Sequence, residues 1–295
     1  MDMNYVLITP ARNEESFIEN TIKAVVSQTV LPRKWVIVSD GSTDNTDKIV
    51  EYYAKRYTFI KLVKTENTSN RNFGSKAKAF NTGYKKLGPV KYNFIGNLDA
   101  DVTFEPEYFE NILKQFEKKP RLGIGGGIIV QLVNNTYYEM KYNLKSVAGA
   151  VQLFRRQCYE NIGGYIPLKF GGIDAAVEII ARMKGWEIQT YPDYKVYHHR
   201  RIGTGYGSIY KSMFQKGINN YTLGYHPVFH IFHSIYFFQK YPYIIGGLLM
   251  ILGYNWALLS KFELQLPRKV IDYLRSEQIQ RMKKFTSFKN LNRGG

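Results

Sequence analysis

The chain has 295 residues, 44% of them hydrophobic, and a formal net charge of +17. This length and apolar content exclude a disordered chain and suffice for one large α/β domain or two smaller ones. A single cysteine, Cys158, excludes an intrachain disulfide framework, and the basic excess indicates an anionic partner without identifying it.

The first 120 or so residues alternate between short apolar runs and amphipathic stretches, after an N-terminus that shows no signal-peptide pattern. We expect strands at 5–8, 35–40, 59–63 and 92–98, and helices at 14–28, 42–57 and 75–87. Ser42 and Thr43 are candidates for the N-cap of the second helix. This alternation predicts a mostly parallel sheet with helices on both faces, whose ligand site lies beyond the carboxyl ends of the strands.

The pattern then becomes mixed. We expect strands at 121–133 and 149–156, a helix at 173–185 and a last short strand at 194–200. From about residue 203 the chain is aromatic and basic, and 241–260 carries no charge between Lys240 and Lys261. That stretch could just span a bilayer, with Tyr and Trp near its ends as interfacial anchors. A monotopic, re-entrant or buried hydrophobic helix fits it as well.

Polar side chains follow several of the expected strands. Asp40 ends the second strand, and Asp99 and Asp101 follow the fourth. Two adjacent carboxylates repel each other unless a cation compensates, and Mg²⁺ commonly joins one or two carboxylates to substrate phosphates. The alternative for Asp99 and Asp101 is a solvated turn that caps the next helix, but their shared edge with Asp40 favours a site.

Other candidates carry weaker signals when taken singly. Arg71 and Lys76 lie near a helix N-terminus, where they could meet a phosphate or form a solvated basic face. Asp174 begins an apolar helix, where a carboxylate is most often an N-cap. His198 and His199 are adjacent on a strand, so that only one of them is expected to face the site.

The order of these motifs resembles glycosyltransferase family 2 over roughly residues 4–205. The resemblance rests on TPARNEE, VIVSDGSTDNT, GSKAKAFNTG, NLDAD, and IDAAVEIIARMKGW followed by VYHHR. It implies the GT-A fold, a Rossmann-like α/β fold with a mixed sheet flanked by helices. The catalytic domain would span 1–205, with a nucleotide-binding half at 1–120 and an acceptor-binding half at 121–205. A C-terminal helical region at 206–295 is expected to associate with a membrane.

The resemblance also implies an inverting transferase that uses a nucleotide-diphosphate sugar and Mn²⁺ or Mg²⁺. Asp101 would bind the metal, with His198 or, failing that, His199, and Asp174 would be the catalytic base. The expected nucleotide-binding residues are Pro10, Arg12, Glu14, Asp40, Arg71, Lys76 and Asp99. Ile173 and Ile180 stand where the family often has Glu and Arg. These two departures concern the acceptor side and leave the base in place.

The basic, aromatic C-terminal third suggests a lipid-linked or other glycan acceptor in cell-surface polysaccharide or glycoconjugate synthesis. We expect the protein at the cytoplasmic face of a membrane, peripheral, monotopic or single-span. A sugar nucleotidyltransferase is a second interpretation, against which the order of Asp174, helix and histidine pair argues. A non-catalytic module that binds anionic membranes or nucleic acid is a third. No RNA- or DNA-binding motif is recognisable, so we expect no nucleic-acid partner.

Overall fold

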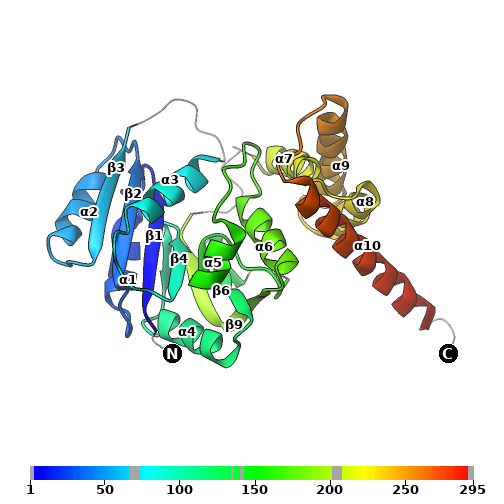
Figure 1. Ribbon diagram of the computed structural model, residues 1–295. Helices are drawn as coiled ribbons and strands as arrows, with labels where there is room; N and C mark the ends of the chain where they lie inside the picture. The colour runs from blue at the N-terminus through cyan, green and yellow to red at the C-terminus, as the bar shows by residue number, and fades with distance from the viewer. Residues whose placement is uncertain (1–2, 67–73, 134–135, 140–142, 201–207, 292–295) are drawn as a thin grey trace. The chain divides into compact units, whose positions relative to one another are not determined.

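The computed structural model describes residues 3–66, 74–133, 136–139, 143–200 and 208–291 (Figure 1). The chain divides into two compact units. The first consists of Met1–Pro167 and Ile173–Ile202, and the second of Leu168–Gly172 and Gly203–Gly295. The domain boundary expected between 205 and 206 lies outside the described residues.

The first unit is built on one mixed sheet. Its strands are β1 (Tyr5–Ala11), β2 (Lys34–Asp40), β3 (Ile60–Thr65), β4 (Phe94–Leu98), β5 (Val102–Phe104), β6 (Leu122–Val133), β7 (Thr136–Glu139), β8 (Val151–Arg155) and β9 (Glu187–His198). The strand order is β3-β2-β1-β4-β8-β6-β9-β5, with β7 paired to β6. The strands β1 to β4 run parallel, whereas β8 is antiparallel to both β4 and β6. The expected mixed α/β sheet is therefore confirmed.

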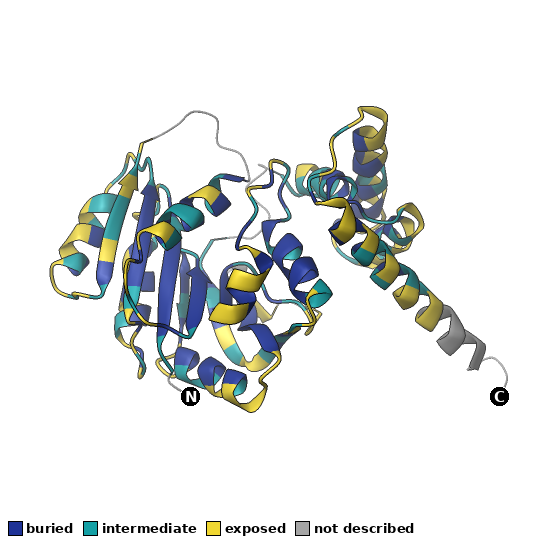
Figure 2. Cartoon of the chain, viewed as in Figure 1, coloured by how far each residue is buried: buried dark blue, intermediate teal, exposed yellow. Residues whose placement is uncertain are grey.

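The helices of the first unit bury apolar faces against this sheet (Figure 2). They are α1 (Ile18–Val26), α2 (Thr46–Ala54), α3 (Gly74–Lys85), α4 (Tyr108–Lys118), α5 (Arg156–Ile162) and α6 (Ile173–Met183). In α4, five residues at helical spacing are buried: Tyr108, Phe109, Ile112, Leu113 and Phe116. Phe109 stacks on Tyr5 of β1 with ring centroids 4.8 Å apart. Burial stabilises by about 2 kcal/mol for each such side chain.

Ser42 and Thr43 were wrong as expected caps of α2. Asn45 stands at the N-cap without a side-chain hydrogen bond, and the amide of Thr46 donates to Oδ1 of Asp44 at 3.0 Å. Ser42 Oγ instead accepts from the amide of Asn13 at 3.2 Å, and the amide of Thr43 donates to Asn13 Oδ1 at 2.8 Å. Parallel pairing of β1 with β2 brings the two following loops together, so these residues join loop to loop.

The carboxyl ends of β1 to β4 meet at one edge of the sheet. Ala11 pairs with Ser39, and Asp40 pairs with Thr65. At the other side of the sheet, β9 begins earlier than expected, at Glu187, because it pairs with β6 over nearly its whole length. A register shift after Gly127 accommodates this pairing. With this shift, β9 extends to His198, at the same edge of the sheet as the carboxyl ends of β1 to β4.

The second unit is helical. It contains α7 (Ile209–Thr222), α8 (Pro227–Tyr236), the 3₁₀ helix η2 (Phe237–Gln239), α9 (Ile244–Leu259) and α10 (Arg268–Leu291). Helices α7 and α9 approach closely, since a methyl group at Gly253 would lie 2.0 Å from the carbonyl oxygen of Phe214. Among the helices that the structure describes, none has the length and apolar character required to cross a bilayer.

Candidate active site

Two aspartates and a histidine meet at the carboxyl edge of the sheet. Asp99 and Asp101 follow β4, and β5 then runs antiparallel to β9, with Val102 opposite His198. This pairing sets His198 Nε2 3.6 Å from Asp101 Oδ1. One ligand atom from each of Asp99, Asp101 and His198 lies within 4.8 Å of the others. Such a set of oxygen and nitrogen donors fits a divalent cation.

A hydrogen bond on the far side of the imidazole orients the ring of His198. His198 Nδ1 lies 2.6 Å from the carbonyl oxygen of Arg200. A carbonyl only accepts, so Nδ1 donates this hydrogen bond, and Nε2 is the ring nitrogen that faces Asp101. Burial and the neighbouring Asp99 charge raise the pKa of Asp101, and a bound cation would oppose that shift.

The structure separates the two histidines. His199 donates its backbone amide to the carbonyl oxygen of Asp101 at 2.9 Å. Its ring Nε2 lies 2.9 Å from Thr103 Oγ1. The geometry thus groups His198 with the two aspartates, while His199 serves the pairing of β5 with β9. The metal role of His198 stays a prediction.

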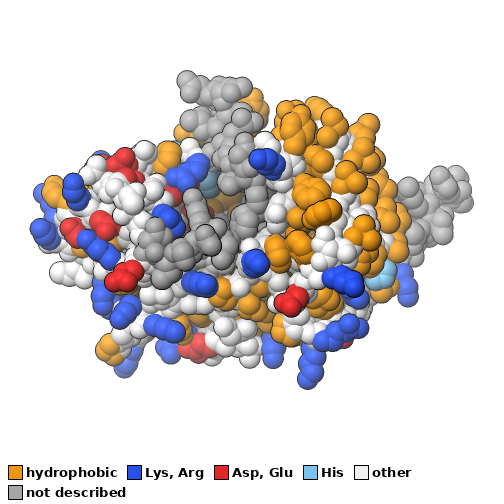
Figure 3. Space-filling view, turned by 90° about the horizontal axis from the view of Figure 1, so that it is seen from above, with side chains coloured by type: hydrophobic (Ala, Val, Ile, Leu, Met, Phe, Trp, Pro, Cys, Tyr) orange, Lys and Arg blue, Asp and Glu red, His pale blue; other side chains and the backbone are white. Residues whose placement is uncertain are grey.

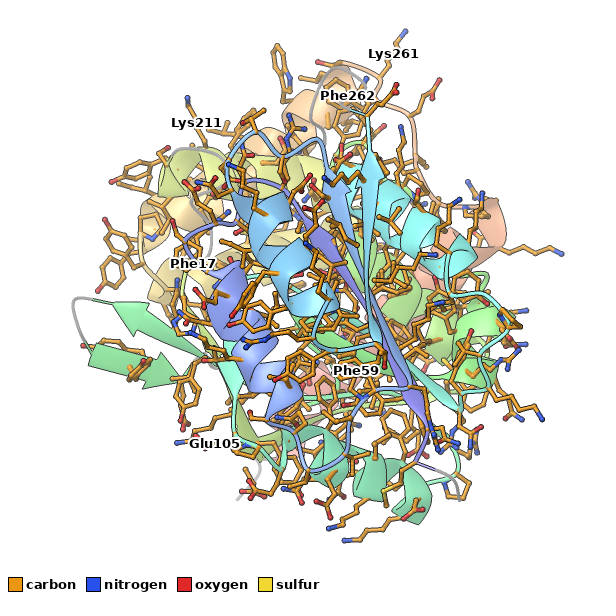
Figure 4. All side chains as sticks on the ribbon, turned by 90° about the vertical axis from the view of Figure 1, so that its left-hand side faces the viewer. Phe17, Phe59, Glu105, Lys211, Lys261 and Phe262 are labelled. Carbon is orange, nitrogen blue, oxygen red and sulfur yellow. The ribbon has the colours of Figure 1, made fainter. Side chains whose placement is uncertain are left out.

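Arg200, which the sequence analysis did not identify, borders the same group. Its guanidinium forms an ion pair with Glu14, and its Nε lies 3.6 Å from Asp101 Oδ2. The guanidinium also lies over the ring of Phe17, 5.4 Å from its centroid; Phe17 is labelled in Figure 4. Glu14, expected at the nucleotide, is thus held by Arg200. The sequence signal that could have identified Arg200 was its position, because it directly follows the histidine pair at the edge of the sheet.

Lys76 links the group formed by Asp99, Asp101 and His198 to the second half of the sheet. It lies in the first turn of α3, and its Nζ is 2.6 Å from Asp99 Oδ1 and 3.2 Å from the carbonyl oxygen of Gly149. Burial opposes the charge of Lys76, but Asp99 and Asp174 outweigh it, and the pKa of Lys76 is raised. The other expected phosphate partner, Arg71, lies outside the described residues.

Asp174 sits inside the first turn of α6, not at its N-cap. Gly171 and Gly172 precede it with φ of +96° and +85°, a region that favours glycine. Its carboxylate lies against Gly149, since a methyl group there would be 1.9 Å from Asp174 Oδ2. Burial raises the pKa of Asp174, whereas the charge of Lys76 lowers it. A buried carboxylate with a raised pKa is suited to accept a proton.

A second carboxylate, Glu178, holds the loop that contains Val147 and Gly149 and lies against Asp174. Glu178 Oε1 accepts the backbone amide of Val147 at 2.6 Å, and burial raises the pKa of Glu178 to about 7. Asn97 of β4 donates from Nδ2 to the carbonyl oxygen of Gly149 at 2.5 Å. The loop is thus anchored from α6 and from the sheet. Sequence reasoning missed both contacts, although Glu178 stands one helical turn after Asp174.

The remaining expected nucleotide-binding residues line the edge formed by β1 to β3. Pro10 is paired with Val38, and Arg12 follows β1 directly. Asp40 ends β2, where its Oδ1 accepts from Thr65 Oγ1 at 3.2 Å. The sheet therefore brings Pro10, Arg12 and Asp40 to the same edge as the aspartates. Their roles at a nucleotide remain predictions.

Comparison with known proteins gives a family match. The model of "Glycosyl transferase family 2" matches residues 6–180. The poly-beta-1,6-N-acetyl-D-glucosamine synthase of Staphylococcus epidermidis is 26% identical over 208 residues, which cover 64% of this chain and 46% of the synthase. The chain thus spans about half the length of that relative.

Two solved structures share the fold. S. aureus TarS in complex with UDP-GlcNAc has a TM-score of 0.56 at 17% identity, over 73% of this chain and 66% of that chain. The mannosyltransferase PcManGT from Pyrobaculum calidifontis, in complex with GDP-Man and Mn²⁺, has a TM-score of 0.56 at 18% identity. The match covers 87% of this chain and 74% of that chain. The first unit accordingly has the GT-A fold.

Proposed function

Because the chain belongs to glycosyltransferase family 2, we propose that it transfers a sugar from a nucleotide diphosphate to a glycan hydroxyl with inversion at the anomeric carbon. The observation that carries the proposal is the placement of two different groups beside Lys76. One is the set of metal-type donors Asp99, Asp101 and His198, and the other is the buried base candidate Asp174. A single displacement requires a leaving-group site and a base, and these two groups supply them.

The donor side uses the edge formed by the first three strands. Asp40 is positioned to accept from the base or ribose of the nucleotide, with Pro10 and Arg12 beside it. Asp99 faces the ribose or sugar. Two proteins with the same fold hold UDP-GlcNAc and GDP-Man, which supports a nucleotide-sugar donor without selecting the base.

The metal is proposed to be Mn²⁺ or Mg²⁺, held by Asp101 and His198 with Asp99 nearby. When bound, it would supply positive charge to the diphosphate as that group leaves. The Mn²⁺ in the related mannosyltransferase structure supports the assignment. Lys76, whose Nζ is 2.6 Å from Asp99 Oδ1, adds a second positive charge.

The proton of the acceptor hydroxyl goes to Asp174. As the acceptor oxygen forms its bond to the anomeric carbon, the bond from that carbon to the diphosphate breaks and its electrons stay on the leaving oxygen. The charge of Lys76 favours the ionised form of Asp174, because it offsets part of the cost of burying that carboxylate. One displacement at the carbon inverts its configuration.

The acceptor is proposed to be a lipid-linked or other glycan in cell-surface polysaccharide or glycoconjugate synthesis. The match to a polysaccharide synthase supports the glycan, and the apolar, basic second unit supports a membrane location. The free thiol of Cys158 and a nucleotide-sugar donor favour the cytoplasmic face.

The test is a screen of nucleotide sugars with Mn²⁺, scored by binding and slow hydrolysis, followed by Asp174→Asn. We expect donor binding to change by less than about threefold and transfer or hydrolysis to fall at least 100-fold. Release of nucleoside diphosphate supports transfer, whereas release of pyrophosphate would assign the protein to the nucleotidyltransferases. Turnover by Asp174→Asn close to that of the wild type would remove Asp174 from the role.

A further inference from the structure

Helix α8 has its polar residues inside and its apolar residues outside. Five large apolar side chains recur at spacings of three and four residues and are each about half exposed: Val228, Ile231, Phe232, Ile235 and Tyr236. On the opposite face His230 and Ser234 are buried, with exposures of 2% and 0%. A helix that meets water on its outer face has the reverse arrangement.

The buried polar face of α8 is satisfied within the unit. Asn220 Nδ2 of α7 lies 3.1 Å from His230 Nδ1 and 3.3 Å from His233 Nδ1. His230 Nε2 lies 3.2 Å from the carbonyl oxygen of Met250 in α9. Burial lowers the pKa of His230 to about 4 and that of His233 to about 3, so both are neutral at physiological pH. The inward polar face is thus part of the packing, and the outward apolar face is a stable feature of the fold.

Helix α9 also exposes large apolar side chains. It buries mainly small residues and exposes large ones at similar spacing: Ile244, Ile245, Leu248, Leu252, Trp256 and Leu259. Gly247 packs so closely on α8 that a methyl group there would lie 2.4 Å from the carbonyl oxygen of Ser234. The two helices are in contact, and we define the eleven exposed residues named for α8 and α9 as the apolar face. Figure 3 shows hydrophobic side chains gathered over this unit.

The segment that carries the apolar face contains charges of one sign only. Between Asp193 and Glu263 the sequence contains no Asp or Glu, while Lys211, Lys240 and Lys261 are spread along it. Lys211 and Lys261 are exposed on the outside of the unit (Figure 4). A second copy of this chain would bring the same positive charge to the interface. An anionic surface would instead be attracted.

We infer that the apolar face of α8 and α9 docks on one leaflet of an anionic lipid bilayer, with both helices lying along the interface. Scattered exposed hydrophobic residues are ordinary, but a contiguous apolar face of this size marks an interaction site. Tyr236 and Trp256 suit the boundary between headgroups and acyl chains, and the lysines suit anionic headgroups. The inference is independent of the chemistry proposed for the first unit, because it concerns binding alone.

The direct test is flotation of the full-length protein with vesicles, of phosphatidylcholine alone or mixed with phosphatidylglycerol. We expect strong binding to the mixed vesicles and weak binding to the neutral ones. The double variant Phe232→Ser/Leu252→Ser should bind mixed vesicles at least tenfold more weakly, because two inserted side chains are lost. The Lys240→Gln and Lys261→Gln variants should each lose about fivefold on mixed vesicles and nothing on neutral ones.

The matched control is Leu31→Ser/Tyr52→Ser. These residues are 46% and 53% exposed in the first unit, so the same kind of change is made outside the apolar face. The control should bind vesicles as the wild type does. Circular dichroism and thermal unfolding of every variant separate loss of binding from loss of fold. A variant that unfolds is replaced by Ile235→Ser, which removes one exposed side chain only.

A second readout places Trp256 in the bilayer. Its fluorescence should shift to the blue with mixed vesicles and be quenched most by lipids brominated near the headgroup end of the acyl chain. Trp256→Phe should abolish both signals, since the other two tryptophans, Trp35 and Trp186, lie in the first unit. Three results would each overturn the inference: no flotation of the wild type, equal binding by wild type and Phe232→Ser/Leu252→Ser, or a wild-type dimer without vesicle binding that this variant abolishes.

Discussion

Gly149 lies directly against the carboxylate of Asp174, so closely that a methyl group on it would stand 1.9 Å from Oδ2. The same glycine presents its carbonyl oxygen to Lys76 and Asn97. The base candidate is therefore positioned by the main chain of a loop as well as by its own helix. The absence of a side chain at position 149 is what allows the carboxylate to occupy this place.

Gly149→Ala is expected to reduce transfer at least 100-fold, because the added methyl group displaces the flexible end of Asp174. Donor affinity should change little, since the donor-binding edge is built by β1 to β3. Steady-state kinetics and calorimetric donor binding measure the two effects. The control is Gly163→Ala, where the methyl group meets nothing within 4 Å but the backbone has φ +79°. That variant should lose about 1 kcal/mol of stability and keep its activity.

The two histidines provide a matched pair for the metal site. His198→Ala should weaken Mn²⁺ binding at least tenfold, because it removes the imidazole nitrogen grouped with Asp99 and Asp101. His199→Ala should leave Mn²⁺ affinity within about twofold, since its ring contacts Thr103. Electron paramagnetic resonance of free Mn²⁺ gives both affinities. The reverse order of effects would transfer the metal role to His199.

Arg200 is expected to oppose metal binding in the absence of donor. Its guanidinium lies close to Asp101 and is paired with Glu14, so Arg200→Ala removes a positive charge from beside Asp101. Mn²⁺ should then bind about tenfold more tightly to the donor-free protein. Arg56→Ala is the control, because Arg56 stacks on Tyr52 on the outside of the fold. Weaker Mn²⁺ binding by Arg200→Ala would instead show that Arg200 organises the site.

Glu178 should make stability depend on pH. Its folded pKa of about 7 exceeds the ordinary value of 4.5, so the folded state binds more protons between these values and stability falls as pH rises through them. Glu178→Gln mimics the protonated form and can still accept from Val147. We expect the variant to gain about 2–3 kcal/mol at pH 8.5 and little at pH 4.5. Thermal unfolding at a series of pH values measures the difference in stability between the wild type and the variant. Parallel curves of stability against pH for the two proteins would contradict the prediction.

Sequence reasoning located the residues whose position depends on local rules. Asp99 and Asp101 follow an apolar strand, and the carboxyl ends of parallel strands share an edge, so their placement beside Asp40 followed from the alternation of elements. Strand alternation also separated His198 from His199 and paired His198 with Val196 on one face. The structure shows both of these side chains buried.

Contacts between distant segments could not be predicted in this way. Gly149 meets Asp174 because β8 returns antiparallel beside β4, and the mixed pattern after residue 120 did not specify that order. Arg200 meets Glu14 across 186 positions of sequence. The caps of α2 failed for a related reason, since Ser42 and Thr43 bind Asn13 of another loop. Local propensity has no access to such partners.

The carbonyl oxygen of Gly149 also has a kinetic consequence. It holds Lys76, and Lys76 is the cation paired with Asp99 on the donor side. A diphosphate that draws Lys76 toward itself would break one of the contacts that hold the loop lying on Asp174, while Asn97 and Glu178 keep theirs. We therefore expect compulsory-order binding, with donor first, and product-inhibition patterns in which the nucleoside diphosphate competes with the donor alone.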